Sequence, residues 1–163
     1  MIRAIIFDCF GVLYPQASGA FFDKYKDLFQ NHLEAMDELN LKIDLGEVNR
    51  NEFFAGLEKV TGIPANAIQD EIDNQLKVDQ GLVDLIKILK TKYKIGLLSN
   101  AGKEEIEIIY RDKIDSLFDS LAVSYEIKSV KPNGKIFLTC LDRLEITPKE
   151  ALEKSIEIMI HQL

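Results

Sequence analysis

Three residues of the sequence could act together on an anionic substrate, namely Asp8, Ser99 and Lys131. A carboxylate can attack a substrate as a nucleophile and form a covalent acyl phosphate or ester. A hydroxyl and a lysine beside it can hold the oxygens of the transferred group as charge develops on them. We also expect free backbone amides at residues 9–11 to form a cradle for the same anion.

These residues lie at the ends of short apolar segments. Residues 2–7 and 93–98 precede the first two, and the weaker segment 120–124 ends at Ser124 and precedes Lys131. Helical patterns follow the second and third segments, which predicts βαβ crossovers and a parallel sheet. Ligands of such sheets bind beyond the carboxyl ends of the strands. We therefore expect the three residues and Ser124 to converge on one rim, with Lys131 opening a helix there.

The rest of the chain predicts the layers around this sheet. Residues 15–79 lack strand signals and carry aromatic side chains at helical spacing, which is typical of a helical bundle. We expect residues 1–14 and 80–163 to form an α/β core, a three-layer Rossmann-like parallel sheet, and residues 15–79 to form an inserted cap. The charged residues 103–107 are interpreted as a solvated helix face.

The composition and charge of the chain bear on which molecules it binds and in which cellular compartment it works. The net charge of −7 and the pI near 4.9 argue against nucleic acid or an anionic membrane as partner, because both bind positive surfaces. No segment is long enough to span a bilayer, and the N-terminus lacks the pattern of a signal peptide. The two cysteines, Cys9 and Cys140, are interpreted as buried thiols. We predict a cytoplasmic protein.

Three segments, in order along the chain, resemble motifs of the haloacid dehalogenase superfamily. Residues 7–13 (Phe-Asp-Cys-Phe-Gly-Val-Leu) are similar to the first motif, residues 97–101 to the second and residues 124–137 to the third. The helical insertion lies where members of one subfamily carry a cap between the first two motifs. The resemblance covers nearly the whole chain.

The resemblance implies a phosphatase that acts on a small phosphorylated metabolite through an aspartyl phosphate on Asp8. It also implies that Mg²⁺ is held by the Asp8 carboxylate and by the backbone carbonyl of Phe10. The implied catalytic residues are Asp8, Ser99 and Lys131, and the implied substrate-binding residues are Phe10, Gly11 and Asn100.

Two departures from the family pattern bear on this function. Phosphatases of the family carry an acid/base aspartate two residues after the nucleophile, where this chain has Phe10, which can neither give nor take a proton. The fourth motif is also missing, because residues 152–157 contain no acidic pair. Asp8 with one backbone carbonyl is a poor magnesium site, and Glu153 and Glu157 are the remaining candidate ligands.

The C-terminal segment is ambiguous. Residues 147–150 predict a strong helix start, and residues 152–159 continue with helical spacing, although the isoleucines at 156, 158 and 160 also alternate as in a strand. In a shifted reading frame, residues 159–162 can encode a sequence similar to the fourth motif. We therefore hypothesise a core truncated or frameshifted at its C-terminus. A lost strand would expose the edge of the first strand, so we expect a homo-oligomer through that edge, or a tail folded over it.

Two other functions remain open. The first is a metal-independent hydrolase similar to 2-haloacid dehalogenases, which carry an aromatic residue at the position of Phe10 and use a cap arginine, for which Arg50 is the only candidate. The second is a catalytically inactive relative or fragment that acts only in binding. Release of phosphate would support the phosphatase, and release of halide without metal would support the dehalogenase. Release of neither by a folded chain would support the inactive relative.

Overall fold

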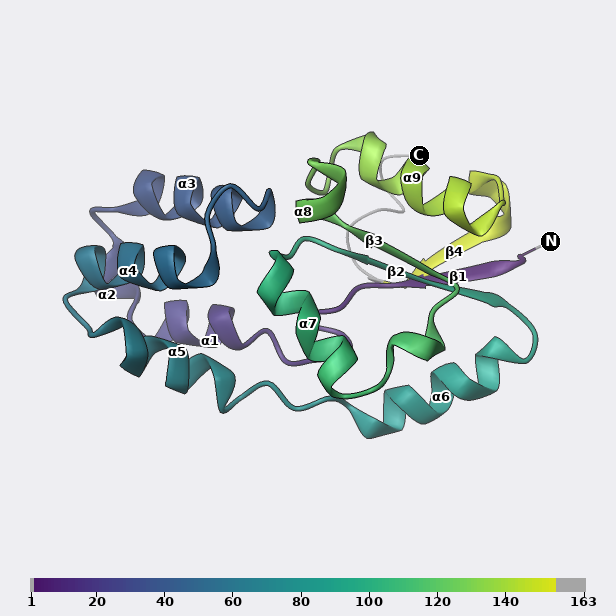
Figure 1. The fold of residues 1–163 in the computed structure, drawn as a ribbon, viewed down its shortest axis with the longest axis horizontal. Helices are drawn as coiled ribbons and strands as arrows, with labels where there is room; N and C mark the ends of the chain where they lie inside the picture. Colours follow the sequence, from purple (N-terminus) through teal and green to yellow (C-terminus); the bar gives the residue numbers. More distant parts are fainter. Residues whose placement is uncertain (1, 155–163) are drawn as a thin grey trace.

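The computed structural model describes residues 2–154. The core of these residues is a four-stranded parallel sheet between two layers of helices (Figure 1). The strands lie in the order β3-β2-β1-β4. Their bounds are Ala4–Phe7 for β1, Lys94–Ser99 for β2, Ser120–Val123 for β3 and Ala151–Lys154 for β4. The three predicted strands and the predicted α/β fold are confirmed.

Strand β1 is buried on both faces of the sheet, which explains its unbroken apolar sequence. Ile5 and Phe7 belong to the hydrophobic cluster shared with helices α6 and α7, whereas Ala4 and Ile6 belong to the cluster under helix α9. This alternation follows from the opposite directions of successive side chains in a strand. The bounds of the helices beside the sheet are Gln80–Lys90 for α6, Lys103–Arg111 for α7, Ser124–Ile127 for α8 and Gly134–Leu144 for α9, with a short 3-10 helix, η1, at Asp115–Leu117.

Five helices between β1 and α6 pack around a separate hydrophobic cluster, on the side of the sheet where the strands end (Figure 1). Asn49 and Glu52 form the predicted capping box of α4, and Asp79 caps α6 through the amide of Leu82. The separate cluster supports an inserted cap, and the boundaries of that cap at residues 15–79 stay a prediction. The helices are α1 (Ala17–Lys24), α2 (Lys26–Phe29), α3 (Leu33–Asp44), α4 (Arg50–Thr61) and α5 (Ala65–Asp73).

The C-terminal segment differs from the helix that its start signal predicted. Of residues 147–154, Pro148–Glu150 form the 3-10 turn η2, and β4 then pairs in parallel with β1, with Ala151 opposite Ala4. A strand is favoured here because the open edge of β1 offers backbone groups that a helix could not pair. The predicted exposure of this edge is therefore wrong, and the predicted folding of the tail over it is confirmed. Self-association stays a prediction.

Other predictions for the tail lie outside the described residues. These concern Glu157 as a metal ligand and residues 159–162 as the site of a frameshift. Glu153 lies within β4, opposite Ile6 in the register of the two strands. Among the helices of residues 2–154, none is long and apolar enough to cross a membrane.

Candidate active site

Two of the predicted site residues, Asp8 and Lys131, are in direct contact. Asp8 follows β1, and its Oδ2 lies 2.5 Å from Nζ of Lys131. Both side chains are 21% exposed, so the pair is shielded on most sides and open on one. The backbone amide of Cys9 donates a hydrogen bond of 2.8 Å to the other carboxylate oxygen, which fixes the carboxylate at the strand end.

Ser99 ends the neighbouring strand, β2. Phe7 lies opposite Leu97 in the register of β1 and β2, so Ser99 is one position beyond the level of Asp8. The Ser99 side chain is buried, and its hydroxyl donates a long hydrogen bond of 3.4 Å to the carbonyl of Asn100. The sheet therefore brings Asp8, Ser99 and Lys131 to one rim, and their catalytic roles remain predictions.

Asn100 holds the segment that carries Lys131. Its Oδ1 accepts a hydrogen bond of 2.7 Å from the Lys131 amide, and its Nδ2 donates one of 3.4 Å to the Lys131 carbonyl. The predicted helix start at Lys131 is wrong, because α9 begins at Gly134 with Asn133 as its cap. A residue before a proline is biased away from helical backbone, and here Pro132 follows Lys131. Lys131 is thus positioned by Asn100 rather than by a helix.

The loop after Asp8 uses backbone amides for its own hydrogen bonds, so these amides are not free to bind an anion. Gly11 has φ of 82°, a left-handed conformation that glycine adopts without steric cost. Its amide donates to the carbonyl of Tyr14 at 2.7 Å, and the Cys9 amide is bound to Asp8. The expectation of free amides is therefore wrong for Cys9 and Gly11. Cys9 is fully buried, and burial raises the pKa of its thiol, in agreement with a core thiol.

Ser124 lies at the end of β3, as predicted, but it is occupied by structural hydrogen bonds. Its side chain is fully buried, and its Oγ accepts from the Ala101 amide at 2.9 Å. The same Oγ lies 2.5 Å from the carbonyl of Asp44, at the end of cap helix α3, and 3.2 Å from the carbonyl of Ala101. Ser124 therefore joins the cap to the loop after β2 and is not available to a bound anion.

A cavity of about 440 Å³ lies between the cap and the rim of the sheet. Phe10 and Asn100 line it from the core, and Phe22, Phe53 and Phe54 are among the cap residues that line it. Phe10 is half-buried, with its ring 6.1 Å from the ring of Tyr14. Cap aromatics interpreted as bundle core thus also form a wall of this cavity. Phe10 and Asn100 follow Asp8 and Ser99 in the chain, so the cavity reaches the end of the sheet, although Asp8, Ser99 and Lys131 are not among its lining residues.

Two partly buried carboxyl groups that line the cavity, those of Asp44 and Glu105, were not identified as site residues from the sequence. Burial raises the pKa of Asp44 to about 6, and the charge of Lys131 opposes this shift. Burial also raises the pKa of Glu105 to about 7, and the charge of Arg50 opposes it. The segment 103–107 was interpreted as a solvated helix face, which is wrong for Glu105. Its position in the first turn of a helix gave no signal of burial.

The described residues do not supply a set of ligands that fits Mg²⁺. Mg²⁺ requires near-octahedral oxygen ligands, of which Asp8 and the carbonyl of Phe10 would give two. One Asp8 oxygen is in contact with Lys131 and the other accepts from Cys9. Over residues 2–154, no group of three or more His, Cys, Asp or Glu side chains is placed to hold a metal ion.

Comparison with known proteins gives one family and several relatives. Residues 2–152 match the hydrolase family described as haloacid dehalogenase-like hydrolase. A glyceraldehyde 3-phosphate phosphatase from Methanopyrus kandleri is 26% identical over 181 aligned positions, which cover 93% of this chain and 74% of that protein. A phosphorylated carbohydrates phosphatase from Thermotoga maritima is 23% identical, with the same two coverages of 93% and 74%.

Solved structures share the fold. An enzyme of the same superfamily from Bacteroides thetaiotaomicron, in complex with magnesium and inorganic phosphate, aligns with a TM-score of 0.72 and 23% identity. The alignment covers 94% of this chain and 84% of that one. At this level of identity the likeness describes the fold alone. It supports the arrangement of cap and parallel sheet described above.

Proposed function

Because the chain belongs to the haloacid dehalogenase-like hydrolases, we propose that it is a phosphatase that acts through Asp8 on a small phosphorylated metabolite. The observation that carries this proposal is the 2.5 Å contact between Asp8 and Lys131 beyond the carboxyl ends of the strands. The relatives named as phosphatases of glyceraldehyde 3-phosphate and of phosphorylated carbohydrates support a small phosphorylated substrate.

In the proposed reaction, a carboxylate oxygen of Asp8 attacks the phosphorus atom. The bond from phosphorus to the alcohol oxygen breaks, and the leaving oxygen takes up a proton from solvent water. Lys131 has three N–H donors, so it can contact Asp8 and a phosphoryl oxygen together. The hydroxyl of Ser99 would bind a second phosphoryl oxygen. Water then attacks the aspartyl phosphate, which releases inorganic phosphate and restores the Asp8 carboxylate.

Phosphatases of the family carry an aspartate that protonates the leaving alcohol, and this chain has Phe10 at that position. General acid catalysis contributes roughly 10²- to 10⁴-fold to a rate, so we expect slow turnover. One enzyme of the superfamily has been solved in complex with magnesium, whereas the described residues of this chain do not form a site for that ion, so the proposed steps use this chain's own side chains.

A dehalogenase is disfavoured by the surroundings of Arg50. Both terminal nitrogens of this guanidinium are bound by the carboxylate of Asp73, with Nη1 3.1 Å from Oδ2. Arg50 is the only arginine within residues 15–79, so the cap offers no other guanidinium for the carboxylate of a haloacid. Halide release is therefore included in the test as the competing outcome.

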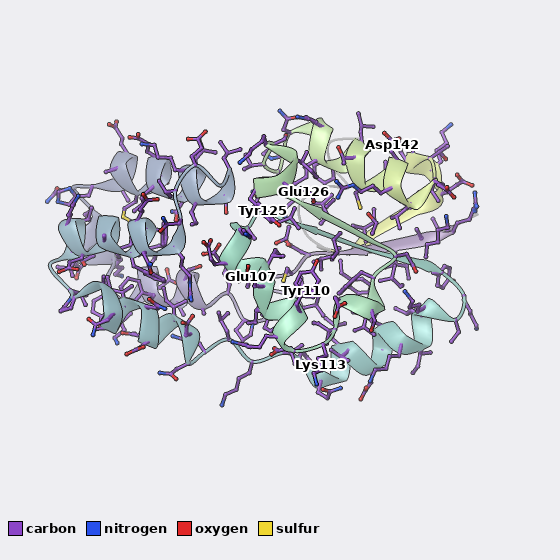
Figure 2. The ribbon with its side chains drawn as sticks, viewed as in Figure 1. Glu107, Tyr110, Lys113, Tyr125, Glu126 and Asp142 are labelled. Carbon is purple, nitrogen blue, oxygen red and sulfur yellow. The ribbon has the colours of Figure 1, made fainter. Side chains whose placement is uncertain are left out.

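The test compares wild type with Asp8→Asn on an aryl phosphate and on phosphorylated three- to six-carbon sugars, with added magnesium and with chelator. We expect slow release of phosphate that is lost in Asp8→Asn. The matched control is Asp142→Asn, whose exposed side chain lies on α9 away from the cap helices (Figure 2) and does not line the cavity. Release of chloride from 2-chloropropionate would support a dehalogenase, and no turnover by a folded chain would support an inactive relative.

A further inference from the structure

Helix α8 carries the side chains that fasten the cap to the core. Among the hydrogen bonds of residues 2–154, those that cross from the core to residues 17–73 come from Ser124, at the start of α8, and from Lys128, directly after it. Figure 1 shows α8 beside the end of cap helix α3. Hydrogen bonding therefore holds the cap at one short segment of the core.

The contact uses the backbone carbonyls at the end of α3. The last carbonyls of a helix have no amide partner within it, and they give this end a partial negative charge. Nζ of Lys128 donates to the carbonyl of Leu45 at 2.6 Å and to that of Gly46 at 3.5 Å. The neighbouring carbonyl, of Asp44, accepts from the hydroxyl of Ser124 at 2.5 Å. The ammonium group of Lys128 thus supplies both a donor and a charge of the right sign.

Gly46 allows the cap to approach α8 closely. Its φ of 65° lies in the left-handed region, which favours glycine. A Cβ atom at this position would lie 3.1 Å from Cβ of Tyr125 and 3.2 Å from Nζ of Lys128. The turn after α3 is therefore fitted against α8, and a side chain at this position would displace the ammonium group.

The segment that binds the cap also carries Lys131, three residues after Lys128. Its turn is closed by two hydrogen bonds, because the amides of Lys128 and Ser129 both donate to the carbonyl of Ser124, at 2.8 and 3.4 Å. Nζ of Lys131 contacts Asp8 at 2.5 Å. This short segment therefore binds the cap at one end and the proposed nucleophile at the other.

The cap also acts on Lys131 through charge. Asp44 is the last residue of α3, and the charge of Lys131 opposes the rise in pKa that burial gives to the Asp44 carboxyl group. By the same interaction, an ionised Asp44 attracts the ammonium group of Lys131. The position of the cap therefore affects the lysine electrostatically as well as through the backbone.

We propose that Lys128 is a positioning residue, which fastens the cap to α8 and thereby keeps the ammonium group of Lys131 at Asp8. Seating of the cap and alignment of the lysine are then a single event. The inference rests on the proposed phosphatase function, which it deepens by naming a residue that acts through Lys131. Lys128 takes no part in the transfer itself.

The experiment measures turnover of an aryl phosphate and, by calorimetry, binding of inorganic phosphate. We expect Lys128→Met to lower kcat/KM by about tenfold and to weaken phosphate binding, because the charged hydrogen bonds to the cap are lost. Lys128→Arg keeps the cation and should restore wild-type values. In the Lys131→Met background, Lys128→Met should cause no further loss, because substitutions that act through one group are not additive.

The matched control is Lys113→Met. Lys113 and Lys128 both have left-handed backbone, with φ of 57° and 55°, and both are exposed, so the two substitutions remove the same group from the same backbone conformation. Lys113 lies past the end of α7 that is farther from α8 (Figure 2). This variant should keep wild-type kinetics and phosphate binding. Thermal unfolding checks that all variants fold.

A second variant approaches the contact from the cap. Gly46→Ala places a methyl group against Nζ of Lys128, so it should reduce kcat/KM in the same direction as Lys128→Met. Combining Gly46→Ala with Lys131→Met should again add no loss. The prediction therefore does not depend on one substitution.

The outcomes separate the inference from the proposed function. Wild-type kinetics and phosphate binding in Lys128→Met overturn the inference, as does an additive loss in the double variant, because Lys128 then acts independently of Lys131. An equal loss in Lys113→Met overturns it as well, since the effect is then one of surface charge. Phosphate binding that depends on Lys128, without turnover, supports the inference and overturns the phosphatase. A wild type that neither binds nor releases phosphate overturns both.

Discussion

The ammonium group of Lys131 lies 2.5 Å from the carboxylate of Asp8, although 123 positions separate the two residues. The contact joins the end of β1 to the loop before α9, and it places a cation at the proposed nucleophile. A lysine in this position can both align the carboxylate and neutralise a phosphoryl group.

Removal of this cation should reduce catalysis with little loss of fold. We expect Lys131→Met to lower kcat/KM for an aryl phosphate by roughly 10²- to 10³-fold, the size of effect seen when one group that stabilises a transition state is lost. Steady-state release of phosphate measures it. Lys149→Met, at an exposed position within η2, is the control and should resemble wild type. A Lys131→Met enzyme with full activity would contradict the proposed site.

Restoring an acid at Phe10 should raise phosphatase activity. Phe10 stands two residues after Asp8 and lines the cavity, so an aspartate there faces the leaving group. We expect Phe10→Asp to increase kcat by about tenfold or more. Phe10→Asn has the same size without the acid and should give no gain. Equal activity of the two variants would show that proton transfer does not limit the reaction.

The buried hydroxyl of Ser124 should contribute to the attachment of the cap. Ser124→Ala leaves the amide of Ala101 and the carbonyl of Asp44 without this partner. We expect a loss of about 1–3 kcal/mol in the free energy of unfolding, measured with urea. Ser18→Ala, at a position that lines the cavity from α1, serves as a serine control. An unchanged free energy for Ser124→Ala would mean that the cap is held elsewhere.

The free energy of unfolding should decrease as pH rises from about 4 to about 7. Burial raises the pKa of Asp44 from 3.8 to about 6 and that of Glu105 from 4.5 to about 7. In this window the folded protein binds more protons than the unfolded chain, so raising the pH favours unfolding. Each group should lower the free energy of unfolding by on the order of 1–3 kcal/mol between pH 5 and pH 7.5. Urea unfolding near these two pH values measures the difference.

The variants Asp44→Asn and Glu105→Gln should flatten this dependence. Glu150 acts in the opposite direction, because hydrogen bonding to the Thr147 amide and to Arg3 lowers its pKa to about 2. The stabilisation that Glu150 gives is lost only below its ordinary value of 4.5, which lies under the measured window. A free energy that is constant between the two pH values would contradict the burial of Asp44 and Glu105.

Local sequence signals predicted the elements that stay within one segment. The apolar run before Asp8 and the run that ends at Ser99 become β1 and β2, because such segments are stable only when buried on both faces of a parallel sheet. The capping box at Asn49 and the cap at Asp79 are likewise local, since each depends on backbone amides within the next three residues. The sequence alone therefore determined the parallel sheet, the inserted helices and the rim.

Tertiary structure decided which side chains meet and which are already occupied. Asn100 binds the backbone of Lys131, and Ser124 binds the cap, although both had the residue type and the strand-end position of a substrate ligand. Glu105 has the sequence context of a solvated helix face, but it is partly buried and lines the cavity together with cap residues. Partners of this kind come from distant segments, whose packing sets burial and hydrogen bonding, and no local pattern records them.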